Sequence, residues 1–178
     1  MNRSVGRKKI FLLSVIFLGS YLLSAPAGSQ TELSPAINNS GLPLPRFVSL
    51  RTDPINMRVG PGIRYPVDWV YLRRNLPMEI ILEFDNWRRV RDPEGVEGWV
   101  HQNMLSGMRT GYVVGAQRRL MRAGLDASKI IATLEHGVIV EIRRCPPRSL
   151  YCRVATNGLD GWIRRDHFWG TYKGETID

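Results

Sequence analysis

Short stretches of alternating apolar and polar residues, separated by turn residues, occur in the same order twice along the chain. This two-residue period is typical of half-buried β-strands. The candidate strands are residues 78–85, 87–91 and 97–101 in the first copy and 137–142, 150–155 and 160–164 in the second. Gly, Pro, Asn and Asp occupy the gaps between them, as tight turns require. Since no amphipathic helix follows residue 28, the pattern predicts an all-β fold.

The two copies align at a nearly constant offset, which makes them a tandem repeat of about 60 residues. Gly98-Trp99-Val100 matches Gly161-Trp162-Ile163, Met57-Arg58 matches Met121-Arg122, and Glu79 matches Glu141. A domain of about 60 residues buries only ~60% of the surface of its unfolded chain and is marginally stable. We therefore expect two small barrels that gain stability by packing together.

The first 27 residues have the organisation of a secretory signal peptide. Four basic residues and no acid precede residue 10, residues 10–23 are apolar, and an Ala25-Pro-Ala27 sequence follows. The apolar run is shorter than the about 20 residues that a membrane-spanning helix needs. We expect cleavage after Ala27 and a periplasmic or secreted protein. An uncleaved N-terminal anchor is the alternative.

Composition sets the expected domain boundaries after the signal peptide. Residues 28–46 contain no aromatic residue and few large apolar ones, which is typical of a flexible linker. The expected order is then a first barrel at 47–108, a linker at 109–115, a second barrel at 116–173 and a tail at 174–178.

The net charge of +9, from 25 basic and 16 acidic residues, is unevenly distributed. Without residues 1–27 the count is 21 basic against 16 acidic, or +5. Residues 46–108 carry nine basic and eight acidic side chains (+1), whereas residues 109–165 carry eleven and four (+7). The second barrel is therefore expected to meet an anionic partner: peptidoglycan carboxylates, an acidic protein face or, by peripheral contact, membrane headgroups. A solvated face that keeps the protein soluble is the alternative. Nucleic acid is not expected, because an exported protein rarely meets it.

Two cysteines, Cys145 and Cys152, flank a short loop between two candidate strands. In an exported protein such a pair is expected to be oxidised, and a bridge across this loop would contribute about 2–3 kcal/mol. The competing hypothesis is a cysteine nucleophile with a histidine base, as in a cell-wall hydrolase. That nucleophile would have to be a free thiolate, and the two barrels leave no catalytic domain.

The first copy opens with Asn56-Met57-Arg58-Val59-Gly60-Pro61-Gly62, followed by Tyr65-Pro66-Val67. This resembles the Asn-x-Arg-x-Gly-Pro signature of bacterial SH3-like domains, and Gly98-Trp99-Val100 fits a later element of the same family. The second copy is similar to a degenerate repeat, since it lacks the Gly-Pro-Gly of the first. Across residues 47–172 the chain resembles exported tandem SH3-like proteins of Gram-negative bacteria. The resemblance implies two strongly bent β-barrels that bind peptidoglycan or partner proteins, although fold analogy alone does not establish function.

Aromatic side chains beside arginine are the expected ligand contacts, because a ring packs on a sugar or peptide while a guanidinium pairs with a carboxylate. Trp87 and Val90 are three residues apart, so a buried Val90 would leave Trp87 pointing outward beside Arg89. Tyr151 and Arg153 stand in the same relation in the second copy. Packing of each aromatic ring against the other barrel or a nearby loop is the alternative. The candidate ligand-binding residues are Asn56, Arg58, Tyr65, Trp69, Tyr71, Trp87, Arg89, Tyr151 and Arg153.

Other residues are expected to shape the fold. The period of residues 78–85 places Met78, Ile80, Leu82 and Phe84 on the buried face, and Glu79 and Glu83 in solvent, with Ile81 as the exception. Trp99 and Trp162 are expected to be fold residues, and the glycine before each suggests a close backbone approach.

The sequence offers no support for a metal or a cofactor, because no His-x-x-x-His or Cys-x-x-Cys spacing occurs. We expect no catalytic residues and a non-enzymatic periplasmic module that recognises peptidoglycan or its peptides. A periplasmic adaptor that docks an acidic partner is the main alternative, and a cell-wall hydrolase subunit is the third. The sequence leaves the oligomeric state open.

Overall fold

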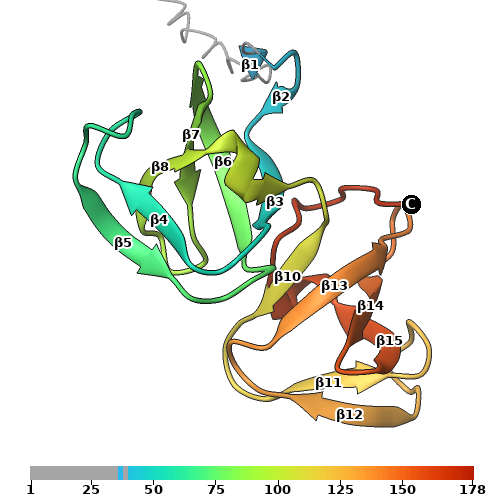
Figure 1. The fold of residues 1–178 in the computed structure, drawn as a ribbon. Coiled ribbons are helices and arrows are strands. Elements are labelled where there is room, and N and C mark those ends of the chain that lie inside the picture. The colour runs from blue at the N-terminus through green and yellow to red at the C-terminus, as the bar shows by residue number, and fades with distance from the viewer. Residues whose placement is uncertain (1–35, 38–39) are drawn as a thin grey trace, which may run out of the picture. The chain divides into compact units, whose positions relative to one another are not determined.

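Each repeat folds into its own curled antiparallel sheet of seven strands (Figure 1). The computed structural model describes residues 36–37 and 40–178, so the predicted signal peptide and most of the predicted first linker lie outside the described residues. The first sheet consists of β3 (Arg46–Leu50), β4 (Ile55–Arg58), β5 (Val67–Tyr71), β6 (Pro77–Phe84), β7 (Trp87–Arg91), β8 (Glu97–His101) and β9 (Leu105–Ser106). The second consists of β10 (Thr110–Val113), β11 (Arg118–Met121), β12 (Ile130–Leu134), β13 (Ile139–Arg144), β14 (Tyr151–Thr156), β15 (Leu159–Arg164) and β16 (Phe168–Trp169).

The two sheets have the same topology. The strand order is β5-β4-β8-β7-β6-β3-β9 in the first and β12-β11-β15-β14-β13-β10-β16 in the second, so each strand has a counterpart. One turn of 3-10 helix precedes the last strand of each sheet: η1 (Gln102–Met104) and η2 (Arg165–His167). The predicted all-β fold of two small β domains is confirmed. No helix formed by the described residues has the length and apolar character needed to cross a membrane.

A close contact between strands occurs at the same place in both cores. A Cβ added to Gly98 would lie 2.6 Å from Met57 Cγ, and one added to Gly161 would lie 2.8 Å from Leu120 Cγ. The predicted close approach at the glycine before each tryptophan is therefore confirmed. The alignment of Met57-Arg58 with Met121-Arg122 is wrong by one residue, because Arg58 lies opposite Trp99 and Met121 lies opposite Trp162.

Strand β6 contains a β-bulge, and β13 contains one at the equivalent point. The register of β6 against β7 shifts between Ile80 and Leu82, which makes Ile81 the extra residue. An extra residue reverses which side chains face the core. Beyond the bulge Glu83 is buried, while Leu82 and Phe84 are 43% and 54% exposed. The prediction that Leu82 and Phe84 face the core and that Glu83 is solvated is thus wrong.

Several expected linker and tail residues belong to the barrels. The predicted linker at 109–115 contains strand β10, which lies between β13 and β16 in the second sheet. Part of the predicted linker at 28–46 forms the hairpin of β1 (Ala36–Ile37) and β2 (Pro43–Leu44), and Leu44 is buried. In the predicted tail, Ile177 pairs with Cys145 through two backbone hydrogen bonds. Backbone pairing of these segments is not evident from their composition.

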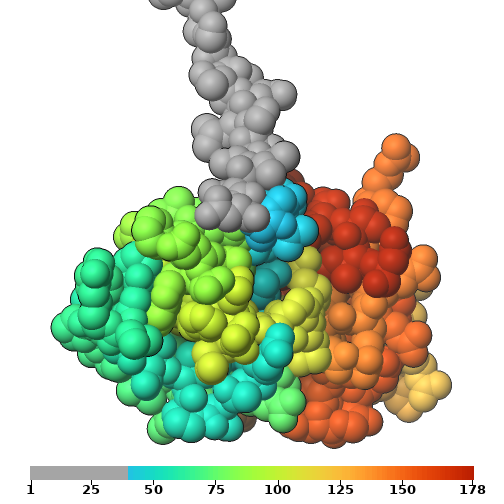
Figure 2. Space-filling view, turned by 45° about the horizontal axis from the view of Figure 1, so that its top comes forward, coloured from blue at the N-terminus to red at the C-terminus, as the bar shows by residue number. Residues whose placement is uncertain are grey.

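The two barrels belong to one compact unit and share contacts. Phe47 of the first barrel packs against Trp169 and Tyr172, with ring centroids 4.8 and 4.7 Å apart. The Tyr172 hydroxyl donates to Glu79 at 2.8 Å, so Glu79 is buried rather than solvated as predicted. Figure 2 shows the red C-terminal residues beside the blue segment that leads into β3. The expected packing of two marginal barrels against each other is therefore observed.

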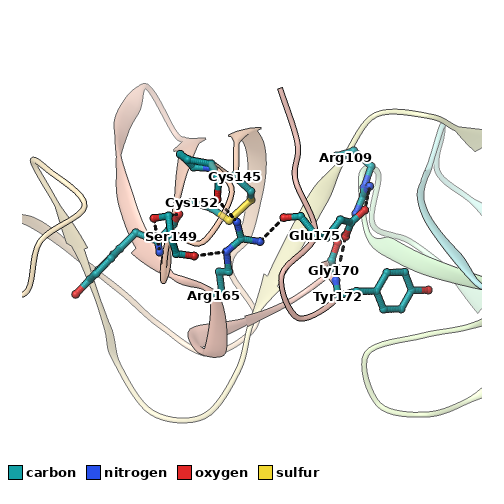
Figure 3. Close-up of a disulfide and its surroundings, with 10 residues drawn as sticks. Arg109, Cys145, Ser149, Cys152, Arg165, Gly170, Tyr172 and Glu175 are labelled. Atoms are coloured by element: carbon teal, nitrogen blue, oxygen red, sulfur yellow. Dashed lines mark hydrogen bonds and ion pairs between the residues drawn. A yellow bond between two sulfur atoms is a disulfide. The ribbon is translucent and has the colours of Figure 1, made fainter.

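Cys145 and Cys152 form the predicted disulfide, which joins the residue after β13 to β14 (Figure 3). Both cysteines are fully buried. Arg165 lies beside the bridge and donates to the carbonyl oxygens of Pro146 at 2.8 Å, Ser149 at 2.8 Å and Glu175 at 2.6 Å. The Arg165 guanidinium thereby connects the disulfide loop with the C-terminal residues through hydrogen bonds.

Candidate functional site

Side chains from four neighbouring strands of the first barrel form one outward surface, which we call the aromatic face. Directly opposed residues in an antiparallel pair lie on the same side of the sheet. One row crosses β4, β8, β7 and β6, and a second row crosses β8, β7 and β6. The first row consists of Arg58, Trp99, Arg89 and Leu82. The second row consists of His101, Trp87 and Phe84.

The burial of the intervening residues shows that this surface faces outward. Along β7 and β8, residues of the aromatic face alternate with Arg88, Val90 and Val100, and these three side chains are buried on the opposite side of the sheet. Trp87 is half-buried and contacts His101 edge-on, with the ring centroids 5.4 Å apart. The bulge at Ile81 adds the exposed side chains of Leu82 and Phe84, so aliphatic, aromatic and cationic groups meet on one surface.

Two arginines give the aromatic face its positive charge. Arg58 donates through Nη1 to the carbonyl oxygen of Tyr65 at 2.7 Å, which ties the β4–β5 loop to the face. Arg89 is 46% exposed, and its Nη2 lies 3.1 Å from Glu97 Oε2. Because a guanidinium has five N–H donors, both arginines keep donors for a carboxylate ligand.

A buried charge cluster lies beneath this surface and fixes the β6–β7 hairpin. The Glu83 side chain is fully buried, accepts a hydrogen bond from Arg46 at 2.6 Å, and lies 3.2 Å from Arg88 Nε. Ser40 donates to it through its backbone N–H at 3.1 Å and its hydroxyl at 2.8 Å. Burial acts to raise the pKa of Glu83, but the hydrogen bonds from Arg46 and Ser40 outweigh it and lower the pKa.

Trp69 and Tyr71 lie together, but not on the aromatic face. Trp69 is opposite Met57, a core residue, and its ring centroid is 6.4 Å from that of Tyr71. Both residues line a cavity of about 140 Å³ together with Tyr112. The Tyr71 hydroxyl donates to Asp92 at 3.0 Å, and burial together with Asp92 raises its pKa far above the usual value. Tyr71 is therefore a buried structural group, while Trp69 is half exposed.

Two other candidates in the first barrel lie at the edge of the site. Tyr65 packs its ring against Gly60, and the Arg64 guanidinium stacks over it at 5.2 Å from the centroid. Asn56 is exposed on β4 opposite Val70. Neither residue belongs to the two rows of the aromatic face.

The second barrel does not repeat the exposed aromatic site. Tyr151 lies on the outward side of β14 with Arg153, but it is only 5% exposed, so the expectation of an exposed ring there is wrong and the alternative, packing against a nearby loop, is observed. The physical reason is the β11–β12 loop: Gly124 approaches Tyr151 so closely that a Cβ there would lie 3.2 Å from Tyr151 Cβ. Arg153 is exposed and pairs with Asp160 at 2.7 Å.

Sequence reasoning missed four members of the aromatic face. Leu82 and Phe84 were assigned to the core, Trp99 to the fold alone, and His101 to no site. The signal for the first two was Ile81, the single apolar residue that breaks the alternation of β6. A break of that kind indicates a bulge, and a bulge turns the following side chains over.

The described residues give no constellation for metal or thiol chemistry. Within residues 36–37 and 40–178, no three His, Cys, Asp or Glu side chains are grouped to hold a metal ion. Both cysteines of the chain are joined in the disulfide, so neither is a thiolate.

Comparison with known families identifies the class of domain. Residues 51–107 match the family model described as bacterial SH3 domain. The first barrel, which carries the aromatic face, is thus a bacterial SH3-like domain, as the Asn-x-Arg-x-Gly-Pro sequence predicted. No curated protein matches the chain.

Two solved structures from Trichomonas vaginalis are similar to this chain. NlpC2 is 16% identical, with 75% of this chain and 50% of that chain covered and a TM-score of 0.32. NlpC1 is 15% identical, with 81% and 51% covered and a TM-score of 0.32. The chain therefore spans about half the length of these two solved chains.

Proposed function

We propose that the protein is a non-enzymatic periplasmic binding module that recognises peptidoglycan or its peptides through the aromatic face. The observation that carries this proposal is the meeting of exposed Phe84 and Leu82, half-buried Trp87, and the cations Arg58 and Arg89 on one surface. Peptidoglycan offers sugar rings and aliphatic peptide groups for the rings, and carboxylates for the arginines.

Co-sedimentation with purified sacculi tests this proposal. We expect the chain without residues 1–27 to sediment at low salt, and less of it to sediment as salt rises, because the arginine contacts are screened. Trp87→Ala should weaken binding about tenfold, as loss of a central aromatic contact typically costs more than 1 kcal/mol. Trp69→Ala is the matched control, since Trp69 is half exposed but lies off the aromatic face. Failure to sediment at low salt, or equal losses in the two variants, would refute the proposal.

The periplasmic location rests on the signal-like sequence of residues 1–27. Mass spectrometry of the protein from a fractionated Gram-negative host should find a chain that begins at Gly28. A cytoplasmic chain that retains Met1 would refute this location.

A periplasmic adaptor for an acidic protein is the second candidate, and the charge of the second barrel favours it. Arg119, Arg122, Arg144 and Arg148 are all exposed there. Pull-down with the same chain should then recover one stoichiometric partner whose binding survives Trp87→Ala. Loss of that partner in Trp87→Ala would instead place it on the aromatic face.

The hydrolase alternative is weakened by the disulfide, because a cysteine nucleophile must be a free thiolate. Zymography of the purified protein should show no clearing of peptidoglycan. Clearing that is lost in Cys152→Ala would overturn the non-enzymatic proposal.

A further inference from the structure

A cationic pocket of about 250 Å³ lies on the second barrel, away from the aromatic face of the first. Its walls come from β11, β14, the end of β15 and η2. Three arginines line it against a single carboxylate, and burial and Arg118 lower the pKa of the lining His167, which favours its uncharged form. The lining residues are Gln117, Arg118, Arg119, Met121, Asp126, Tyr151, Arg164 and His167. An excess of positive charge in a concave surface attracts anions.

The chain's own carboxylate occupies the mouth of this pocket. The Tyr151 hydroxyl donates a hydrogen bond to Asp126 Oδ1, and Arg164 Nη1 lies 3.6 Å from the same oxygen. Asp166 holds Arg164 in place through two hydrogen bonds of 3.1 Å. The Asp126 side chain is nevertheless 78% exposed, so it reaches the pocket groups from the solvent side.

The segment around Asp126 contacts the barrel in the way that a bound peptide would contact it. Gly124 lies close against the ring of Trp162, because a Cβ there would be 3.1 Å from Trp162 Cε3. The carboxylate follows two residues later. One short segment of the chain thus makes two kinds of contact. Its glycine packs against an aromatic ring, and its carboxylate contacts a tyrosine hydroxyl and a guanidinium.

Comparison with the first barrel shows that the fold does not need this carboxylate contact. The β4–β5 loop has the same length as the β11–β12 loop and closes in the same way: Val59 N–H donates to Pro66 O at 3.2 Å, and Arg122 N–H donates to Lys129 O at 2.9 Å. At the position of Asp126 the first barrel has Ile63, which is 84% exposed. The loop therefore keeps its closing hydrogen bond without a carboxylate at its tip.

We propose that the cationic pocket is a binding site for an acidic peptide side chain, and that Asp126 occupies its mouth in the absence of such a ligand. Tyr151 and Arg164 bind the ligand carboxylate, and Arg119 adds an exposed cation that forms no hydrogen bond or ion pair with other described residues. The volume of about 250 Å³ is below the roughly 300–1,000 Å³ of pockets that enclose a whole drug-sized ligand, so it suits a single side chain of a peptide. This site is independent of the aromatic face, so either proposal stands if the other fails.

The test uses a probe copied from the chain: the acetylated and amidated peptide Ala-Gly-Leu-Asp-Ala-Ser, which is the sequence of residues 123–128. Its affinity for the full chain and for full-length Asp126→Asn is measured by isothermal titration calorimetry. Removing an internal competitor raises the apparent affinity by the reciprocal of the fraction of time that the pocket is open, so an open fraction on the order of one-tenth gives a gain of about tenfold. We expect that gain for Asp126→Asn, and no binding of a peptide in which Asn replaces the Asp.

Asp160→Asn is the matched control, because it removes the same charge from an exposed ion pair of the same barrel outside the pocket. It should leave the peptide affinity unchanged, and Arg119→Gln in the Asp126→Asn chain should lower it severalfold. Equal gains in Asp126→Asn and Asp160→Asn, equal binding of the Asn peptide, or no gain at all would overturn the proposal. Phosphatidylglycerol vesicles form a further arm: if Asp126→Asn improves binding to them but not to the peptide, a lipid surface is the ligand and the peptide proposal is wrong.

Discussion

Replacing Glu83 with alanine should destabilise the first barrel far more than an ordinary loss of an ion pair. The Glu83 side chain is fully buried, and its partners Arg46 and Arg88 are only 18% and 7% exposed. Removing one partner of a buried pair costs about 3–5 kcal/mol, because the remaining charge is left buried without compensation. The two hydrogen bonds from Ser40 are lost as well. We therefore expect Glu83→Ala to lose at least about 3 kcal/mol of stability.

Urea unfolding followed by far-ultraviolet circular dichroism measures this loss. The matched control is Glu141→Ala, whose side chain is 38% exposed and pairs with a 53% exposed Arg143. An exposed pair of that kind is worth about 0.2–1 kcal/mol. Adding Arg88→Ala to Glu83→Ala should restore part of the loss, since it removes one of the uncompensated charges. If Glu83→Ala costs no more than Glu141→Ala, the buried cluster does not stabilise the hairpin and the reasoning fails.

Three further predictions concern stability. Folding lowers the pKa values of Glu83 and Glu175 below the usual 4.5, so the stability that they contribute is complete above about pH 4.5 and is lost as the pH falls through the folded-state values. The free energy of unfolding, measured between pH 3 and 6, should therefore decrease less steeply with falling pH in Glu83→Gln. An unchanged pH dependence would contradict this. Full reduction of the Cys145–Cys152 bridge, checked by thiol titration, should cost about 2–3 kcal/mol, and the double serine variant should match it; no loss in either would show that the bridge is dispensable. Gly98→Ala should cost about 1–3 kcal/mol in the same unfolding assay, because its Cβ would meet Met57 at 2.6 Å, whereas Gly107→Ala, with nothing within 4 Å, serves as the neutral control; equal costs would contradict the close packing.

The disulfide of the second barrel and the buried Glu83–Arg88 ion pair of the first occupy equivalent positions. Counting from the paired residues Ile80 and Val90 in one barrel, and Ile142 and Val154 in the other, Cys145 takes the place of Glu83 and Cys152 the place of Arg88. In each barrel a cross-link thus joins the two sides of the equivalent hairpin, β6–β7 in the first barrel and β13–β14 in the second. Acid should loosen this cross-link in the first barrel, and a reductant should loosen it in the second.

The sequence was a good guide to two neighbouring strands of the first barrel. The expected segments 87–91 and 97–101 are β7 and β8, residue for residue, because alternation and turn residues define them locally. It was a poor guide to β10, whose four residues, Thr110–Val113, are too few to show a period. Their strand character comes from pairing with β13 and β16, which lie far along the chain.

The candidate site was predictable only in part. Trp87 and Arg89 were found from their spacing to Val90, and the structure places both on the aromatic face. Tyr151 fulfils the same spacing rule but is covered by a loop that carries Gly124 against it. Local spacing fixes the side of a strand on which a residue lies, whereas its exposure depends on segments elsewhere in the sequence.

The extra residues Ile81 and Arg143 have a consequence for how such a duplicated protein diverges. Before each bulge both barrels keep an isoleucine in the core, Ile80 and Ile142, while the first outward residue after it is Leu82 in one barrel and Arg144 in the other. Beyond the bulge the buried cross-link residues Glu83 and Cys145 alternate with these outward positions, so only the outward positions are left to vary. After gene duplication, a copy can acquire a new partner through substitutions at the outward positions without any change to its core.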